Sequence, residues 1–184
     1  IEDTDVSRRV EGAEEEIMDS LRWLGLDWDE GPVVGGDYAP YRQSERLPIY
    51  QEMARRLVEE GRAYPCYCSP ERLAEMRAQQ AKEKRPPGYD RRCRHLAPED
   101  RPQGITPSVR FTVPATGQTT FHDLIRGDVT FDNAVLDDFV LLKSDGYPTY
   151  HLANVVDDHI MEISHIMRGD EWIPSTPRHV LLYA

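Results

Sequence analysis

Residues 145–171 read DGYPTYHLANVVDDHIMEISHIMRGDE, a stretch in which side chains that can bind a polar ligand alternate with apolar ones. The apolar residues indicate partial burial, and a buried polar group is costly unless it has a partner or a ligand. This stretch therefore predicts a binding site. Its polar members are Tyr147, Tyr150, His151, Asn154, Asp157, Asp158, His159 and Arg168.

Within this stretch we expect a helix over residues 148–156 and a strand over residues 160–167, with Arg168 directly after the strand. Ligands of open α/β sheets lie beyond the carboxyl ends of the strands, so Arg168 could pair with a carboxylate or phosphate. The alternative for Arg168 is an ion pair with Asp170 or Glu171.

The other charged or titratable residues of the stretch are more readily explained as structural. His151 and His159 resemble packed histidines, and one of Asp157 and Asp158 is expected to bond to the backbone rather than to hold a metal.

Three helices are expected before residue 85. Apolar residues recur at helical spacing over residues 10–24, ending at Gly25, and over residues 47–58, with Pro48 in the first turn. Ser69 and Pro70 are typical of the N-cap and first turn of a third helix that runs to about residue 84.

Beyond residue 107 the pattern changes to short segments bounded by turns, which predicts strands near residues 109–113, 119–125, 129–131 and 139–143. Residues 175–177 (STP) would begin a last helix. Helices that flank a β-rich unit predict an α/β domain interrupted by a second domain.

Length and charge limit the class of protein. The chain has 184 residues, a net charge of −11 and no apolar run long enough to cross a membrane, and its acidic start does not resemble a signal peptide. We expect a monomeric cytoplasmic protein and, from the absence of an initiator Met, a fragment.

The acidity disfavours nucleic-acid binding, yet residues 77–94 hold seven Lys or Arg against two acids, a local excess of +5. That stretch is either a solvated loop or a phosphate-binding surface.

Two pairs of possible metal ligands lie at a spacing of two residues: Cys66 with Cys68, and Cys93 with His95. In an extended segment residues i and i+2 face the same side, so two such pairs could close a tetrahedron. Three Cys and one His form an accepted structural zinc site. The alternative is buried free cysteines beside a surface histidine.

Several motifs of the chain resemble bacterial glutamyl-tRNA synthetase. They are IEDTD (residues 1–5), WLGL (23–26), YRQSER (41–46), YPCYC (64–68), GYPTYHLANVVDDH (146–159), RGDEW (168–172) and STP (175–177). The resemblance covers essentially the whole chain in the same order. It implies part of a Rossmann-type class I synthetase catalytic domain (residues 1–64 and 146–184), interrupted by an α+β insertion (65–145) that binds the tRNA acceptor end and carries the zinc site.

The resemblance also implies an activity and a role for each matching residue. The enzyme would use ATP and Mg²⁺ to activate L-glutamate to glutamyl-adenylate, and would transfer glutamate to the 3′ end of tRNA(Glu). Glu2 would bind the amino group, Tyr150 and Asn154 would line the glutamate pocket, and Arg168 would pair with a carboxylate. Glu171 and Trp172 would lie toward ATP and the terminal adenosine. The ligands of a structural Zn²⁺ would be Cys66, Cys68, Cys93 and His95, with no catalytic nucleophile or base.

The HIGH-type and KMSKS-type signatures of that family do not occur in these 184 residues, so we expect that this piece alone does not activate glutamate. Two other functions are weighed against the main one. One is glutamyl-queuosine tRNA(Asp) synthetase, whose later zinc ligands lie closer to the first Cys pair. The other is a non-catalytic, zinc-bearing module that binds tRNA acceptor ends.

Overall fold

The computed structural model describes residues 1–5 and 10–184. The helices are α1 (Ala13–Trp23), α2 (Leu47–Glu59), α3 (Pro70–Lys82), α4 (Tyr150–Ile160) and α5 (Thr176–Tyr183). The strands are β1 (Ala63–Cys66), β2 (Ser108–Phe111), β3 (Gln118–Asp123), β4 (Gly127–Asp132) and β5 (Val140–Leu142). Four short 3-10 turns join them: Gln43–Glu45, Pro98–Asp100, Asn133–Val135 and Asp170–Ser175.

The first three helices begin and end close to the positions that the sequence predicts. The hydroxyl of Ser69 accepts a hydrogen bond from the Arg72 backbone N–H at 3.2 Å, which caps α3 as expected. Gly25 and Gly61 follow α1 and α2 with φ of 72° and 73°, the left-handed conformation in which glycine has no steric penalty.

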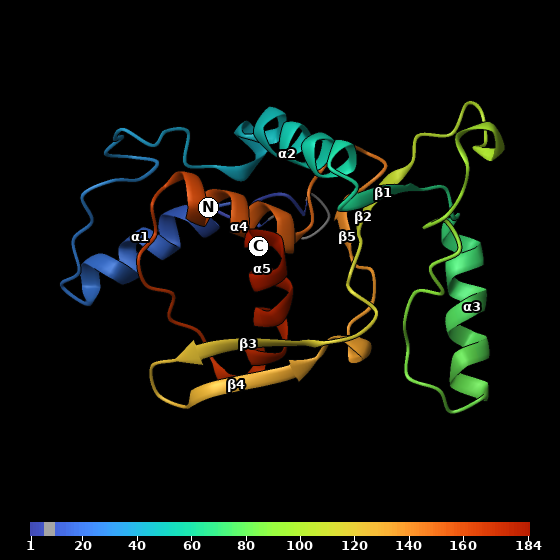
Figure 1. Cartoon of the computed structure of the whole chain (residues 1–184). Helices are drawn as coiled ribbons and strands as arrows, with labels where there is room; N and C mark the ends of the chain where they lie inside the picture. The colour runs from blue at the N-terminus through green and yellow to red at the C-terminus, as the bar shows by residue number, and fades with distance from the viewer. Residues whose placement is uncertain (6–9) are drawn as a thin grey trace.

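Two antiparallel sheets make up the β structure of the described residues. Strand β2 lies between β1 and β5 in a three-stranded sheet, while β3 and β4 form a separate hairpin. In Figure 1 the hairpin crosses in front of α5, and β3 packs against that helix. Helix α3 stands apart, at the end of β1. The β-rich unit expected after residue 107 is therefore confirmed.

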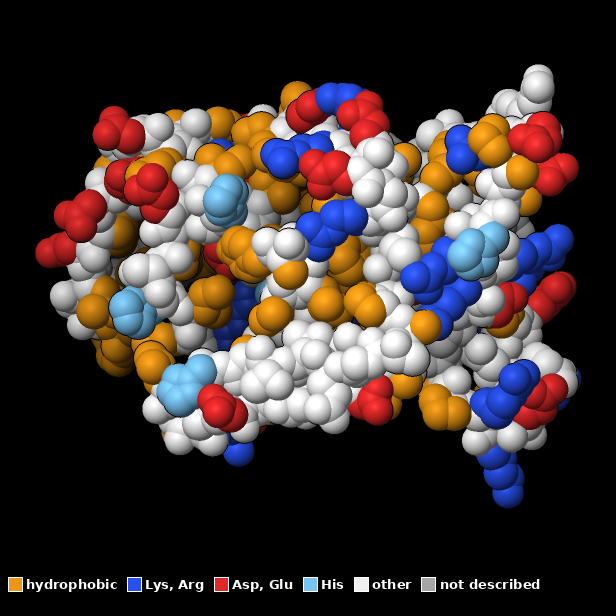
Figure 2. All heavy atoms as spheres, in the orientation of Figure 1, with side chains coloured by type: hydrophobic (Ala, Val, Ile, Leu, Met, Phe, Trp, Pro, Cys, Tyr) orange, Lys and Arg blue, Asp and Glu red, His pale blue; other side chains and the backbone are white. Residues whose placement is uncertain are grey.

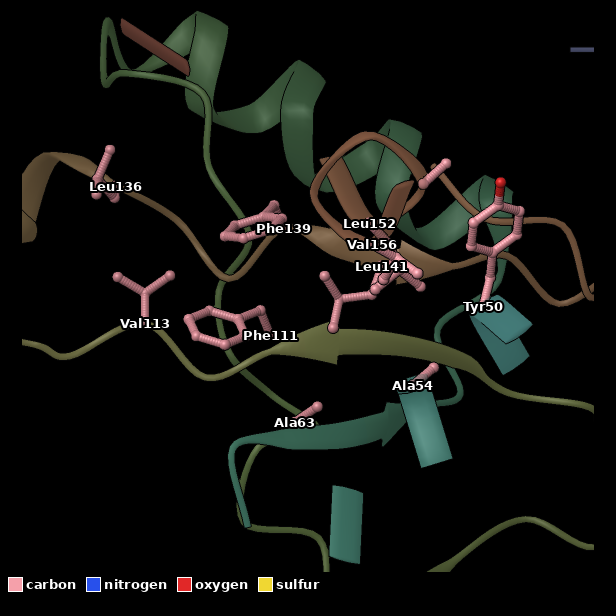
Figure 3. Close-up of a cluster of buried hydrophobic side chains, with 11 residues drawn as sticks. Tyr50, Ala54, Ala63, Phe111, Val113, Leu136, Phe139, Leu141, Leu152 and Val156 are labelled. Atoms are coloured by element: carbon pink, nitrogen blue, oxygen red, sulfur yellow. The ribbon is translucent and has the colours of Figure 1, made fainter. Parts of the chain in front are cut away.

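One apolar core joins parts of the chain that are far apart in sequence. Tyr50 and Ala54 of α2, Phe111 of β2, Leu141 of β5 and Leu152 of α4 pack together in it (Figure 3). Because residues from all three predicted segments share this core, the boundaries at residues 64/65 and 145/146 do not mark separate cores. As domain boundaries they stay a prediction.

The segment YRQSER (residues 41–46) is hydrogen-bonded through its side chains to α1 and to the start of the chain. Arg42 donates from Nε and Nη2 to the two carboxylate oxygens of Glu14 on α1, at 2.8 and 2.7 Å. Ser44 donates from its backbone N–H and its hydroxyl to the two oxygens of Asp3, at 2.8 and 2.6 Å. The described start of the chain and α1 are thus tied to the segment that leads into α2.

The strand expected over residues 160–167 is wrong. Ile160 is the last residue of α4, and residues 163–169 have no regular secondary structure, with Ile163 and Met167 exposed. A strand needs a neighbour for its backbone N–H and C=O groups, and no described strand lies beside this segment. All strand pairs among the described residues are antiparallel, so the parallel sheet of a Rossmann-type domain is not formed by them. None of the described helices could span a lipid bilayer.

Candidate functional site

Helix α4 carries two of the predicted site residues, Tyr150 and Asn154, on one face. Tyr150 and Asn154 are four residues apart, which places their side chains one above the other. The start of the helix is held against β5, because Thr149 donates from its backbone N–H to the Leu141 carbonyl at 2.8 Å and from its hydroxyl to the Val140 carbonyl at 2.6 Å. The position of this face is therefore fixed by the sheet.

Three predicted site residues meet at Asn154. Arg168 donates from Nη2 to the Asn154 side-chain oxygen at 2.6 Å, and the Asn154 amide nitrogen lies 3.5 Å from a Glu2 carboxylate oxygen. The structure thus brings a guanidinium, an amide and a carboxylate together from positions more than 150 residues apart in the chain. Such a set can bind a ligand that carries both an anionic and a cationic group.

Two aromatic rings complete this cluster. The rings of Tyr150 and Trp172 are 4.9 Å apart, and the Arg168 guanidinium carbon lies 5.2 Å from the first and 5.5 Å from the second. Burial raises the pKa of the Tyr150 phenol, with a further rise from the charges of Glu2 and Asp158 that Arg168 opposes. The phenol therefore stays protonated at neutral pH and can donate a hydrogen bond.

The remaining predicted residue, Glu171, lies beside the cluster and not within it. Its side chain folds back over Gly169, where an added Cβ would come within 2.4 Å of a Glu171 carboxylate oxygen. Asp170 forms an ion pair with Arg126 of the β3–β4 turn. Arg168 therefore pairs with neither Asp170 nor Glu171 and donates its hydrogen bond to Asn154.

The Asp157 carboxylate lies at the centre of a largely buried network of side-chain hydrogen bonds. It accepts from Arg46 Nε at 2.8 Å, from the Tyr50 hydroxyl at 2.8 Å and from Gln43 Nε2 at 3.1 Å. These donors come from the YRQSER segment and α2, more than 100 residues away in the chain. The sequence gives no signal for this pairing, beyond an Arg in a segment that leads into an apolar helix.

His151 is a packed histidine, as expected, but its partner was not expected. Its Nδ1 lies 3.1 Å from Nε2 of the buried His179 on α5. Burial lowers the pKa of His151 to about 4 and that of His179 to about 3, and the nearby charge of Arg178 adds to this effect. Both rings are therefore neutral at pH 7.

The three cysteines form a second cluster, at the end of β1 and in the loop after α3. The Sγ atoms of Cys66, Cys68 and Cys93 all lie within 4.8 Å of one another, and those of Cys68 and Cys93 are 3.6 Å apart. Zinc–sulfur bonds of about 2.3 Å in a tetrahedron place sulfurs about 3.8 Å apart. The spacing of these thiols therefore fits one metal ion.

His95 lies outside this group of thiols in the described structure, so its place in a Cys₃His set stays a prediction. Residues 92–95 form a turn in which the Arg94 N–H donates to the Arg91 carbonyl at 3.0 Å. The rule that residues i and i+2 share a face holds for extended chain, not for a turn. His95 is exposed, and the group of residues close enough to share an ion contains the three cysteines alone among the His, Cys, Asp and Glu of the described chain.

The phenol of Tyr89 lies against two of the three thiols. Its oxygen is 3.3 Å from Cys66 Sγ and 3.4 Å from Cys68 Sγ, and it accepts from the Cys93 backbone N–H at 3.1 Å. Arg110 stacks on the Tyr89 ring at 3.8 Å and points Nε toward Cys66 Sγ at 3.4 Å. A charged residue in the middle of a short strand was the available sequence signal for this contact.

Burial and the hydrogen bonds to these thiols shift the thiol pKa values in opposite directions. Burial acts to raise the pKa of Cys66, but hydrogen bonds from Tyr89, from the Cys68 backbone and from Arg110 outweigh it and lower the pKa to about 7. Burial raises the pKa of Cys68 to about 11, helped by the neighbouring thiols. The cluster is thus set up for one thiolate before any metal binds.

The basic stretch of residues 77–94 divides into paired and exposed cations. Arg91 and Arg94 lie 3.5 and 3.6 Å from the buried carboxylate of Asp138, so they belong to the fold. The exposed cations without an ion pair among the described residues are Arg77, Lys82, Lys84 and Arg92. Figure 2 shows Lys and Arg side chains at the right of the molecule, near α3, with acidic side chains among them, and further acidic side chains at the far left.

Comparison with known proteins identifies the family. The family model described as tRNA synthetases class I (E and Q), catalytic domain, matches residues 1–184. The chain is 63% identical to a glutamate–tRNA ligase of Dehalococcoides mccartyi and 54% identical to one of Fusobacterium nucleatum, in each case over 100% of this chain and 37% of the relative.

A solved structure agrees with the sequence relatives. The crystal structure of a glutamate tRNA ligase from Elizabethkingia meningosepticum, in complex with its amino acid, matches with a TM-score of 0.91 and 41% identity. The match covers 100% of this chain and 39% of that one, so the chain spans a little over a third of the length of its relatives. This chain belongs to the class I tRNA synthetase (E and Q) catalytic-domain family.

Proposed function

We propose that these residues form part of a glutamate–tRNA ligase, which activates L-glutamate with ATP and Mg²⁺ and transfers it to the 3′ end of tRNA(Glu). The observation that carries this proposal is the meeting of Arg168, Asn154 and Glu2 on the Tyr150 face of α4. Relatives named glutamate–tRNA ligase at 54–63% identity support it, and do not favour the queuosine enzyme or a non-catalytic module.

The charges of the cluster match those of glutamate. One glutamate carboxylate would pair with Arg168, the amino group would pair with Glu2, and the Tyr150 phenol and Asn154 amide would donate or accept at the sides. Pairing with a ligand carboxylate would replace the contact that Arg168 makes with Asn154. Glu171 and Trp172, three and four residues beyond Arg168, would lie toward ATP and the terminal adenosine of tRNA.

These residues would act by positioning. Adenylate formation is an attack of a carboxylate oxygen on the α-phosphate, which is catalysed mainly by alignment and by neutralising phosphate charge. Holding the side-chain carboxylate at Arg168 and the amino group at Glu2 would leave the α-carboxylate free to react. No side chain of the cluster needs to act as a nucleophile.

The test uses the complete protein that carries this chain and measures glutamate-dependent exchange of pyrophosphate into ATP in the presence of tRNA(Glu). We expect Arg168→Lys to raise the KM for glutamate strongly while the KM for ATP changes little, because Lys lacks the planar fork that pairs with a carboxylate. Arg55→Lys is the matched control, since Arg55 pairs with Glu52 on the exposed face of α2, outside the cluster. Complete protein without exchange activity would refute the function, and activity of the 184 residues alone would refute the expectation that they need the rest.

We also propose one structural Zn²⁺ held by Cys66, Cys68 and Cys93, with the Tyr89 oxygen as the fourth ligand instead of the predicted His95. When bound, the ion would join the end of β1 to the loop after α3. Metal analysis is expected to give one zinc per chain, lost in Cys68→Ser, weakened in Tyr89→Phe and kept in His95→Ala. Loss in His95→Ala with retention in Tyr89→Phe would reverse the assignment of the fourth ligand.

The exposed cations of the α3 region are proposed to contact phosphates of the tRNA acceptor end. Binding through phosphates releases counterions, so the affinity falls steeply with salt. Replacing Lys82 and Lys84 with Gln should weaken binding of an acceptor minihelix RNA and reduce its salt dependence. Lys143→Gln, a control that follows β5 and pairs with Asp145, should not. Equal effects of both changes would speak against this surface.

A further inference from the structure

His151 and His179 are a buried pair with no assigned task. They come from α4 and α5, and their facing ring nitrogens, Nδ1 and Nε2, are 3.1 Å apart. At this distance one ring donates a proton and the other accepts it, which requires that both rings are uncharged. Their lowered pKa values agree with that state.

Both rings of the pair contact Tyr150. The centroid of the Tyr150 ring is 5.6 Å from that of His151 and 5.7 Å from that of His179, and 4.9 Å from that of Trp172. Three rings therefore surround the phenol ring over which the Arg168 guanidinium lies. Within the described part of the chain neither histidine is hydrogen-bonded to Glu2, Asn154 or Arg168, so the pair contacts the cluster through the Tyr150 ring.

We infer that the hydrogen bond between His151 and His179 sets the orientation of Tyr150, which makes His179 a positioning residue for the glutamate cluster. This inference rests on the proposed function. The bond joins α5 to the first turn of α4, the turn from which the Tyr150 side chain projects. Without it the Tyr150 ring can turn away, and both its contact with Arg168 and its hydrogen bond to the ligand become weaker.

The two nitrogens of the bond can be replaced one at a time. The amide nitrogen of glutamine occupies about the place of a histidine Nε2, and that of asparagine about the place of Nδ1. His179→Gln and His151→Asn should therefore keep the bond, while His179→Asn and His151→Gln should lose it. The two variants at each position remove the same ring and differ in how far the amide nitrogen reaches from the backbone.

The assay measures the KM for glutamate, the KM for ATP and kcat in the complete protein, together with its thermal midpoint. A hydrogen bond of about 1 kcal/mol corresponds to about a five-fold change in affinity. We expect a rise of about this size in the glutamate KM for His179→Asn and His151→Gln, with the ATP KM unchanged. His179→Gln and His151→Asn should recover most of the glutamate affinity.

The outcomes separate this inference from the function on which it rests. Wild-type protein without glutamate-dependent exchange would refute the proposed function and the inference with it. Active wild type whose Gln and Asn variants do not differ at either position would refute the inference alone. So would variants that lower the thermal midpoint while both KM values stay the same, because the pair would then support only the fold.

Discussion

Replacing Asp157 with asparagine is predicted to lower the free energy of unfolding by about 3–5 kcal/mol, the usual cost of breaking a buried ion pair by removing one partner. The carboxylate accepts from Arg46, from Tyr50 with both oxygens and from Gln43, at 2.8 to 3.1 Å. Its partner Arg46 is 2% exposed, so water cannot replace the lost interaction.

The magnitude follows from what asparagine can still accept. Its one oxygen can keep part of the contacts, but its amide group turns N–H donors toward a site where the neighbours are themselves donors. Hydrogen bonds to charged groups contribute about 1.5–3 kcal/mol each. Losing the charge and two such bonds, while Arg46 remains buried without a counter-ion, gives the stated range.

The assay is urea unfolding of the 184-residue chain at 25 °C, followed by circular dichroism at 222 nm. Arg46→Met and the double variant complete a double-mutant cycle, in which a coupling of about 2 kcal/mol or more is expected. Arg55→Met is the matched control, because Arg55 pairs with Glu52 on the exposed face of α2 and its loss should leave the urea midpoint unchanged. A loss below about 1 kcal/mol in Asp157→Asn would refute the reasoning.

Three further outcomes are expected. Since the pKa values of His151 and His179 are lowered by burial to about 4 and about 3, the folded chain binds fewer protons than the unfolded chain below pH 6.5. Stability should be complete above pH 6.5 and fall as the pH drops toward 4, by up to about 1.4 kcal/mol per pH unit for each ring; an unchanged urea midpoint between pH 7 and pH 5 would contradict this. Ser69→Ala should cost about 1 kcal/mol through the lost cap of α3, measured by urea unfolding with Ser164→Ala as the control. Leu141→Ala, at a fully buried position, should cost about 2–5 kcal/mol by the same measurement.

The sequence predicts best what depends on near neighbours. The cap of α3 needs only Ser69 and the N–H three residues later, and the helix is found where expected. The strand over residues 160–167 fails for the opposite reason, because a strand forms only beside another strand and the described residues supply none there.

The same division holds for the candidate site. Residues 150, 154, 168 and 172 come together as the resemblance to glutamyl-tRNA synthetase implies, although the strand that was to carry Arg168 is missing. His95 lies apart from the thiols because its segment turns, and the contact of Tyr89 with the cysteines could not be predicted because a phenol among cysteines leaves no regular spacing. The Asp157 network could not be predicted, since its partners are more than 100 residues away.

The two walls of the proposed glutamate site differ in how they are built. Tyr150 and Asn154 project from α4, whose backbone is bonded throughout and whose start is fastened to β5. Arg168 follows residues 164–167, which make no backbone–backbone hydrogen bonds to other described residues. The α4 wall would thus be preformed, whereas a bound ligand would have to hold the wall that carries Arg168 in place. Its affinity would be reduced by the entropy of ordering that second wall, about 1–2 kcal/mol for each residue that becomes fixed. The rate at which the ligand leaves would then be set by the wall that carries Arg168, and stiffening that segment would lengthen the residence time without adding a contact.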